Sequence, residues 1–306
     1  EDGLVHAVDG VSFSVERGKV LAVVGESGSG KSVTGFSILG LVDPPGRIVG
    51  GSVRFDGQEL VGLGQEGLRR LRGRRIAMVF QDPMMTLNPV LSVGEQMLLA
   101  FRAHRDAPRA VARARARDLL GLVGIPSPEE RLDAYPHQLS GGMRQRVAIA
   151  IALLHEPDLI IADEPTTALD VSIQGQILHE MKRLARDTGV ALVWITHDLA
   201  VVSNLADDIA VMYAGRIVET GPAREVLARP RHPYTRGLLD SVPGEAPAGS
   251  MLAQIPGSTP SLLRLPPGCS FRERCTRASE ACATMPELHA RGAGAVRCHH
   301  ALEPAP

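Results

Sequence analysis

The sequence has few aromatic residues and no excess of charge of either sign. Six Phe, three Tyr and one Trp occur among 306 residues. Aliphatic side chains must therefore form most of the core, and a platform of rings that stacks on nucleic-acid bases is not expected. The 33 basic and 34 acidic residues give a net charge of -1. A protein that holds nucleic acid by its phosphates normally carries a basic excess, so nucleic acid is not an expected partner.

Long apolar runs and a leader segment are also lacking. The longest unbroken apolar run, Val147–Leu154, has eight residues, whereas about 20 are needed to span a bilayer. No charged segment followed by an apolar run opens the chain, as a secretory signal would. We therefore expect a cytoplasmic chain that reaches a membrane only through partners. Cysteine is missing from the first 268 residues, and all four cysteines follow, which marks the C-terminal segment as chemically distinct.

The composition and the order of apolar segments are typical of a folded α/β protein. Hydrophobic residues make up 44% and charged residues 22%, and the length suggests two domains of about 150 residues each. Strand-like runs alternate with helical patterns, which predicts a mostly parallel sheet covered by helices on both faces. The expected strands are Val11–Val15, Val20–Val24, Gly51–Phe55, Ile76–Phe80, Leu159–Ala162, Val190–Ile195 and Asp208–Met212, and the expected helices are about 32–41, 138–154, 171–188 and 199–207.

Two regions interrupt this alternation. Residues 93–123 are helical throughout, which predicts a helical subdomain inserted into the sheet domain. Arg109, Arg113 and Arg117 lie on one face of it, which we interpret as a solvated surface rather than a nucleic-acid patch. After about Arg229 the composition shifts to Pro, Gly and Ala, which predicts a linker and a small appended module.

A glycine-rich loop, Gly25–Ser32, fits the pattern G-x-x-x-x-G-K-[ST] between an apolar strand and a helix. Such a loop lets backbone N–H groups converge on phosphate oxygens at a helix N-terminus. Lys31 is then expected to reach the β- and γ-phosphates, and the Ser32 hydroxyl to ligate Mg²⁺. The residues expected to bind the nucleotide here are Gly25, Ser27, Gly28, Gly30, Lys31 and Ser32.

Two carboxylates, Asp163 and Glu164, follow the apolar run Leu159–Ala162. Asp163 can hold Mg²⁺ through its water shell. Glu164 stands where a general base could polarise the water that attacks a phosphoanhydride. Together with the phosphate loop, this pair predicts nucleotide hydrolysis at the carboxyl ends of parallel strands.

A third motif, Leu139–Arg146, reads LSGGMRQR at the start of a predicted helix. It resembles the signature motif of the nucleotide-binding subunits of ABC transporters. Further elements stand in the order of that family: Gln81 after the strand at 76–80, the turn Ala168–Asp170, and His197 after the strand at 190–195.

The resemblance implies a fold and a division into domains. The fold is α/β: a P-loop NTPase (RecA-like) sheet core with an inserted helical subdomain at about 84–144, an antiparallel β portion, and a small irregular C-terminal module. The ATPase domain would cover residues 1–230, and a C-terminal extension with the cysteines would cover 231–306.

The resemblance also implies roles for single residues. Ser140, Gly141 and Gly142 would face the phosphate loop of another subunit, so that ATP lies between two chains. Asp170 would belong to the loop that links the two sites. The catalytic residues would be Glu164, His197, Gln81 and Lys31, and Mg²⁺ would be held by Ser32, Gln81 and Asp163. The family stacks adenine on an upstream aromatic ring, but the one candidate, Phe13, is expected in the core, so we assign no residue to that role.

Two further segments are similar to the ATPase subunits of oligopeptide and dipeptide importers. These are Gln81–Val90 and His232–Thr235, and the frame of the C-terminal cysteines agrees with them. This branch implies a second ATPase subunit, expected to be a different chain, two membrane-spanning permease subunits and an extracytoplasmic peptide-binding protein, with this chain at the cytoplasmic face of the membrane. Uptake of nickel or another small solute is an alternative, and a soluble ABC ATPase acting on nucleic acid or ribosomes is a more distant one.

The four cysteines leave three interpretations open. Cys269, Cys275, Cys282 and Cys298 can ligate a 4Fe-4S cluster, bind tetrahedral Zn²⁺, or form two disulfides. The reducing cytosol argues against disulfides, and the absence of close C-x2–4-C pairs argues against zinc. Some members of the peptide branch carry a 4Fe-4S cluster on such cysteines, so the resemblance makes the cluster the favoured prediction.

Overall fold

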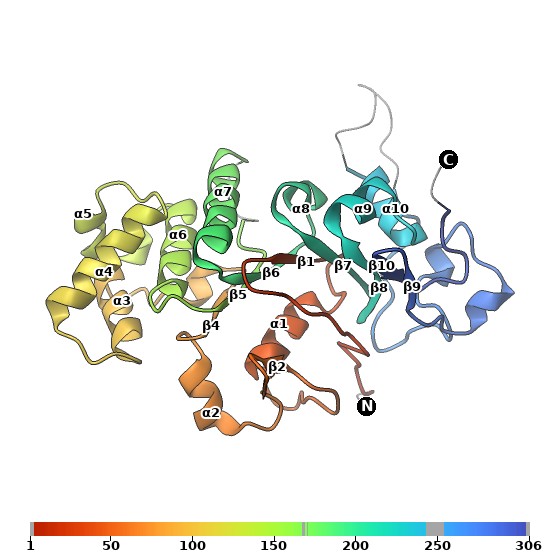
Figure 1. Cartoon of the computed structure of the whole chain (residues 1–306), viewed down its shortest axis with the longest axis horizontal. Helices are drawn as coiled ribbons and strands as arrows, with labels where there is room; N and C mark the ends of the chain where they lie inside the picture. The colour runs from red at the N-terminus through yellow and green to blue at the C-terminus, as the bar shows by residue number, and fades with distance from the viewer. Residues whose placement is uncertain (1–2, 167–168, 170, 243–253, 304–306) are drawn as a thin grey trace. The chain divides into compact units, whose positions relative to one another are not determined.

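The computed structural model describes residues 3–166, 169, 171–242 and 254–303 (Figure 1). The chain forms two compact units. The first unit contains residues 1–15, 20–36 and 195–306, and the second contains residues 16–19 and 37–194. Strand β6 (Ala191–Thr196) crosses from the second unit into the first.

The first unit is built on a mixed sheet. β1 (Val20–Val24) is buried along its whole length and pairs in parallel with β7 (Asp208–Tyr213), with Leu21 opposite Asp208. β8 (Arg216–Pro222) then runs antiparallel to β7, followed by β10 (Gly294–Val296) and β9 (His289–Arg291), also antiparallel. A strand buried on both faces is expected to be continuously apolar, as β1 is.

Four helices and an irregular segment complete the first unit. The helices are α1 (Lys31–Leu39, whose last three residues belong to the second unit), α8 (Leu199–Leu205), α9 (Ala223–Ala228) and α10 (Pro233–Asp240). Residues 254–303 contain only β9, β10 and two short 3-10 helices, Arg272–Arg274 and Glu280–Ala283. Their anchor is Phe271, whose ring packs edge-on against Tyr213 and Tyr234 at centroid distances of 5.2 and 5.3 Å.

The second unit combines a parallel strand pair with a group of helices. β4 (Ile76–Val79) pairs with β5 (Leu159–Asp163), with Val79 opposite Ala162. A small hairpin, β2 (Arg54–Phe55) and β3 (Gln58–Glu59), precedes α2 (Gly64–Leu71). The remaining helices are α3 (Val93–Arg102), α4 (Arg109–Leu122), α5 (Pro128–Leu132), α6 (Gly141–Ala152) and α7 (Val171–Thr188), with 3-10 turns at Pro83–Met85 and Pro136–Gln138.

The helical pattern predicted for residues 93–123 is found as α3 and α4. α4 contacts α3, α5 and α6, and Figure 1 shows these helices grouped together. Met97, Leu120 and Leu132 are fully buried between them. The arginine face is a solvated one: Arg113 forms ion pairs with Glu129 and Asp133, and Arg117 with Asp118.

The expected α/β class is confirmed, and one expected strand is wrong. Residues 11–15 alternate in exposure, but no strand is formed there, because a strand needs a backbone partner and none of the described residues provides one. Phe13 is accordingly only partly buried. The strand expected at 51–55 shortens to Arg54–Phe55. The antiparallel β portion had been expected without residue bounds. No range had been predicted for strands β3, β8, β9 and β10 or for helices α2, α5, α9 and α10.

Within the part of the chain that the structure describes, no helix combines the length and the apolar character needed to cross a membrane.

A buried carboxylate joins β8 to the start of the C-terminal segment. Glu219 is 2% exposed, and its carboxylate accepts hydrogen bonds from the backbone N–H groups of Arg231 (2.7 Å) and His232 (2.9 Å). Burial raises the pKa of Glu219, and those hydrogen bonds oppose the rise. The side chain therefore satisfies two backbone donors that would otherwise lack a partner.

We expect Glu219→Ala to lower the free energy of unfolding by about 1–3 kcal/mol, because it leaves these two donors unpaired. Urea denaturation followed by circular dichroism measures this loss. Glu225→Ala, which alters an exposed carboxylate on α9, serves as the matched control and should change stability by less than about 0.5 kcal/mol. Equal losses in the free energy of unfolding for Glu219→Ala and Glu225→Ala would contradict the stabilising role given to the hydrogen bonds of Glu219.

Candidate functional site

The predicted phosphate loop connects β1 to α1 in the first unit. Gly25 has φ +153° and Gly30 has φ +97°, and a Cβ atom at either position would lie 2.2 Å from a carbonyl oxygen, that of Met212 or that of Ala7. Gly28 also has positive φ, +78°. The loop thus requires glycine for its backbone conformation and for its close approach to neighbouring backbone.

Lys31, the first residue of α1, lies against the loop's own carbonyl groups. It is 5% exposed, and its Nζ donates to the carbonyl oxygens of Gly25 (2.8 Å) and Glu26 (2.9 Å). Ser29 is 1% exposed, and its hydroxyl has no hydrogen-bond partner among the described residues. A glycine-shaped loop, a helix N-terminus and a buried hydroxyl without a partner fit the binding of phosphate.

The carboxylate pair lies at the end of β5 in the second unit. Asp163 is 2% exposed, and Glu164 has φ +45°, a left-handed conformation that is unfavourable for a non-glycine residue by about 1–3 kcal/mol. Gln81 follows β4, and its Nε2 donates to Oε2 of Glu164 at 3.3 Å. Because β4 and β5 are parallel neighbours, the two side chains meet at their carboxyl ends.

The signature residues form the N-terminus of α6 in the second unit. The Ser140 hydroxyl accepts a hydrogen bond from the backbone N–H of Met143 (3.3 Å) and so caps the helix. Ser140 and Gly141 are exposed, and a Cβ atom at Gly141 would meet nothing within 4 Å. Glycine at position 141 is therefore not required by contacts among the described residues of this chain.

The predicted site residues are divided between the two units. Gly25–Ser32 and the exposed His197 belong to the first unit. Gln81, Ser140–Gly142, Asp163 and Glu164 belong to the second. Asp170 lies outside the described residues.

One partner of the phosphate loop had not been predicted. The Glu26 carboxylate accepts two hydrogen bonds from the guanidinium of Arg274, at 2.6 and 2.9 Å. Glu26 lies in the predicted phosphate loop and Arg274 directly precedes Cys275, but no sequence pattern connects positions 248 residues apart.

The four cysteines are free thiols. Cys282 is buried and the others are partly buried. Burial raises the pKa of Cys269, Cys275 and Cys298, that of Cys298 to about 11, and the nearby thiols add to the rise. No group of three or more His, Cys, Asp or Glu side chains in the described part of the chain is arranged to hold a metal ion. The disposition of these side chains therefore does not support the predicted 4Fe-4S cluster.

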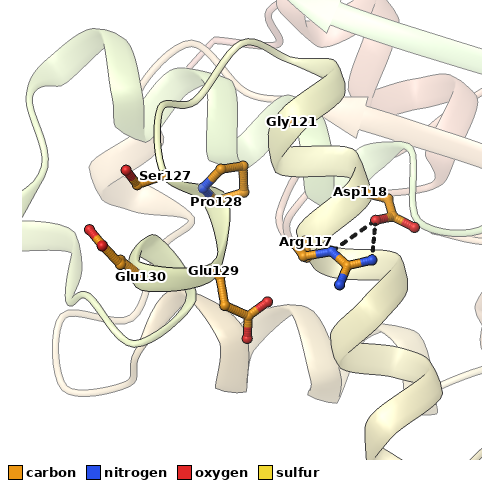
Figure 2. A pocket seen from close by; sticks show the side chains of 7 residues that line it. All are labelled: Arg117, Asp118, Gly121, Ser127, Pro128, Glu129 and Glu130. Carbon is orange, nitrogen blue, oxygen red and sulfur yellow. Dashed lines mark hydrogen bonds and ion pairs between the residues drawn. The ribbon is translucent and has the colours of Figure 1, made fainter.

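An open surface depression of about 580 Å³ lies where α4 meets α5 (Figure 2). Its lining consists of Arg117, Asp118, Gly121, Ser127, Pro128, Glu129 and Glu130. Figure 2 shows Arg117 turned toward Asp118, with which it forms an ion pair, and none of the predicted site residues lines the depression.

Comparison with known proteins agrees with the motifs. Residues 8–167 match the ABC transporter family, and residues 218–282 match the oligopeptide/dipeptide transporter C-terminal region. The dipeptide transport ATP-binding protein DppD of Escherichia coli is 48% identical over 100% of this chain and 94% of its own length. The oligopeptide transport ATP-binding protein OppD of the same organism is 48% identical over 97% of this chain and 88% of its own length.

A solved structure has the same fold. The ATP-binding cassette MJ0796, in a dimeric post-hydrolysis state bound to ADP and Pi, is 31% identical with a TM-score of 0.65, over 71% of this chain and 91% of that one. The chain therefore belongs to the ABC transporter family and has its P-loop ATPase fold, extended by the oligopeptide/dipeptide transporter C-terminal region.

Proposed function

We propose that this chain binds and hydrolyses ATP to energise an ABC importer for dipeptides or oligopeptides. The observation that carries the proposal is similarity along the entire chain, C-terminal region included, to the E. coli proteins DppD and OppD. The proposed division is an ATPase domain at 1–230, with its helical subdomain at about 84–144, and an extension at 231–306.

ATP would bind with its phosphates on the loop Gly25–Ser32. Gly25, Gly28 and Gly30 give the loop its positive-φ backbone, and the N-terminus of α1 at Lys31 would turn the positive end of the helix dipole toward the phosphate oxygens. Lys31 would exchange its carbonyl partners for the β- and γ-phosphates. Ser32, Gln81 and Asp163 would hold Mg²⁺, which supplies positive charge to the phosphate oxygens.

Hydrolysis would proceed by attack of water on the γ-phosphorus, with loss of ADP. Glu164 would accept the proton of the attacking water. The hydrogen bond from Gln81 and the strained backbone at Glu164 support this role, since both restrict where the carboxylate can point. His197 would position the γ-phosphate and the water.

Two ATPase subunits would enclose ATP between them. The N-terminus of α6 is exposed, and at Gly141 no contact with the described residues requires glycine. Both features support binding of a phosphate brought by a second subunit to Ser140, Gly141 and Gly142. Asp170 would link the two sites. The proposed complex sits at the cytoplasmic face of the membrane and comprises a second, different ATPase chain, two permease subunits and an extracytoplasmic peptide-binding protein.

The cysteines would hold one metal group in the folded transporter. We propose a 4Fe-4S cluster on Cys269, Cys275, Cys282 and Cys298, with Zn²⁺ as the alternative. Support comes from the proximity of the four thiols: Cys269, Cys275 and Cys282 lie close enough to Cys298 to raise the pKa of its thiol. Binding would require loss of the thiol protons and adjustment of the side chains into a ligand set.

We expect Glu164→Gln to abolish ATP hydrolysis by the assembled transporter while leaving ATP binding within about threefold of the original, because the amide cannot accept a proton. Phosphate release and nucleotide titration measure the two quantities. Glu156→Gln, at an exposed carboxylate of the second unit, is the control. Normal turnover in Glu164→Gln would remove it as the base.

In a bacterial strain deleted for this gene, we expect the chain to restore uptake of a radiolabelled dipeptide, and Lys31→Ala not to restore it. Uptake of ⁶³Ni²⁺ measured in parallel tests the alternative cargo. Recovery of nickel uptake without recovery of dipeptide uptake would overturn the peptide assignment and leave the ATPase assignment standing.

For protein purified without oxygen, we expect iron and sulfide near four of each per chain, with a visible absorption band that Cys275→Ser removes. Elemental analysis and the absorption spectrum measure this. About one zinc per chain would establish the alternative, and absence of both metals would refute a metal site.

A further inference from the structure

The side-chain carboxylate, the backbone N–H and the backbone carbonyl of Glu26 all form hydrogen bonds. Residues of the C-terminal extension are the partners of the carboxylate and of the N–H. The carboxylate accepts the two hydrogen bonds from Arg274 and a third from the Thr259 hydroxyl at 2.9 Å. The backbone N–H donates to Oη of Tyr234 at 2.8 Å. The backbone carbonyl accepts from Nζ of Lys31 at 2.9 Å. Glu26 thus connects the extension to the lysine of the phosphate loop within one compact unit.

Arg274 is held in place on every side. Its side chain is 6% exposed, and its Nε donates to the carbonyl oxygen of Pro256 at 2.9 Å. Its guanidinium lies over the rings of Tyr213 and Phe271, with centroids at 5.8 and 5.9 Å. A bidentate pair of this kind, once its guanidinium is fixed by packing, restricts the carboxylate strongly.

The charge of the pair is maintained at physiological pH. Burial pulls the pKa of Glu26 upward, but hydrogen bonds from Arg274 and Thr259 and the charges of Arg274 and Lys31 outweigh it, so the pKa lies below its ordinary value. A carboxyl with a lowered pKa contributes stability above its ordinary pKa and loses that contribution as the pH falls through the lowered value. The ion pair is therefore intact throughout the neutral range.

We propose that Arg274 is a positioning residue for ATP: through Glu26 it fixes the backbone of the phosphate loop and, with it, the carbonyl oxygen that holds Lys31. The inference rests on the proposed ATP site. This positioning role explains why Arg274 of the C-terminal extension is buried against the phosphate loop, whose own motif requires only glycine, lysine and serine. The extension is, in this respect, a structural part of the nucleotide site.

The expected result of Arg274→Ala is a rise of about tenfold in both the Kd of the full chain for ATP and the KM of the assembled transporter, the factor that one charge-assisted hydrogen bond supplies. The value of kcat should change by less than about threefold, because Glu164 and Gln81 are untouched. A merely structural role would lower the folded fraction, and therefore kcat and the melting temperature, and would leave KM unchanged.

Arg272→Ala is the matched control. It removes an arginine from the same 3-10 helix whose guanidinium donates only to the carbonyl oxygen of Pro267 in the described structure, and KM should stay as in the original chain. Glu26→Ala should reproduce the rise in KM, and the double variant with Arg274→Ala should be no worse than either single variant. Arg274→Lys keeps the positive charge but cannot form the bidentate pair of hydrogen bonds, so its KM should lie between that of the original chain and that of Arg274→Ala.

An unchanged KM in Arg274→Ala, or effects of the two single variants that add in the double variant, would overturn the proposal. If Arg274→Ala does not fold, Arg274→Lys and Glu26→Ala carry the same test. Failure of the ATP site itself is distinguishable, because Lys31→Ala would then bind ATP as well as the original chain, and the inference would fall with it.

Discussion

The packing of the phosphate loop against neighbouring backbone is the constraint on which the first unit depends. Gly25 approaches the Met212 carbonyl of β7, and Gly30 approaches that of Ala7, both too closely for any side chain. β1 must therefore lie beside β7 in the register that the buried residues of both strands adopt. The same loop leads directly into the N-terminus of α1, where under the proposed function the phosphates of ATP would bind.

The second unit concentrates different chemistry at the end of a strand pair. β4 and β5 are short, buried and parallel, so the residues that follow them meet at one edge. Gln81 and Glu164 do so, and Glu164 adopts a left-handed backbone to reach its position. Backbone strain such as that at Glu164 persists only where the surrounding residues fix the conformation, and it is commonly found at functional sites.

The C-terminal extension continues the core of the first unit rather than standing apart from it. β10 adds to β8, and Phe271 joins Tyr213 and Tyr234 in one aromatic group. The Arg274 guanidinium lies over the rings of Tyr213 and Phe271, and its side chain is 6% exposed, a low-dielectric setting that strengthens its hydrogen bonds to Glu26. Three of the ten aromatic residues in the sequence lie in this one group.

The sequence by itself determined the elements whose chemistry is local. The phosphate loop, the carboxylates after β5, the capping serine of α6 and the helical insertion are each specified by residues a few positions apart. The strands β8 and β10 were not predictable in the same way: β8 follows a two-residue turn at Ala214 and Gly215 that lacks the usual Asn-Gly signal, and β10 has only three residues. Residues 11–15 show the reverse error, since an alternating pattern becomes a strand only when another strand is available to pair with it. Tertiary structure alone decided that Glu26 would meet Arg274 and Tyr234, because a contact between residues more than 200 positions apart depends on how the buried faces of distant segments pack, and no local pattern records that.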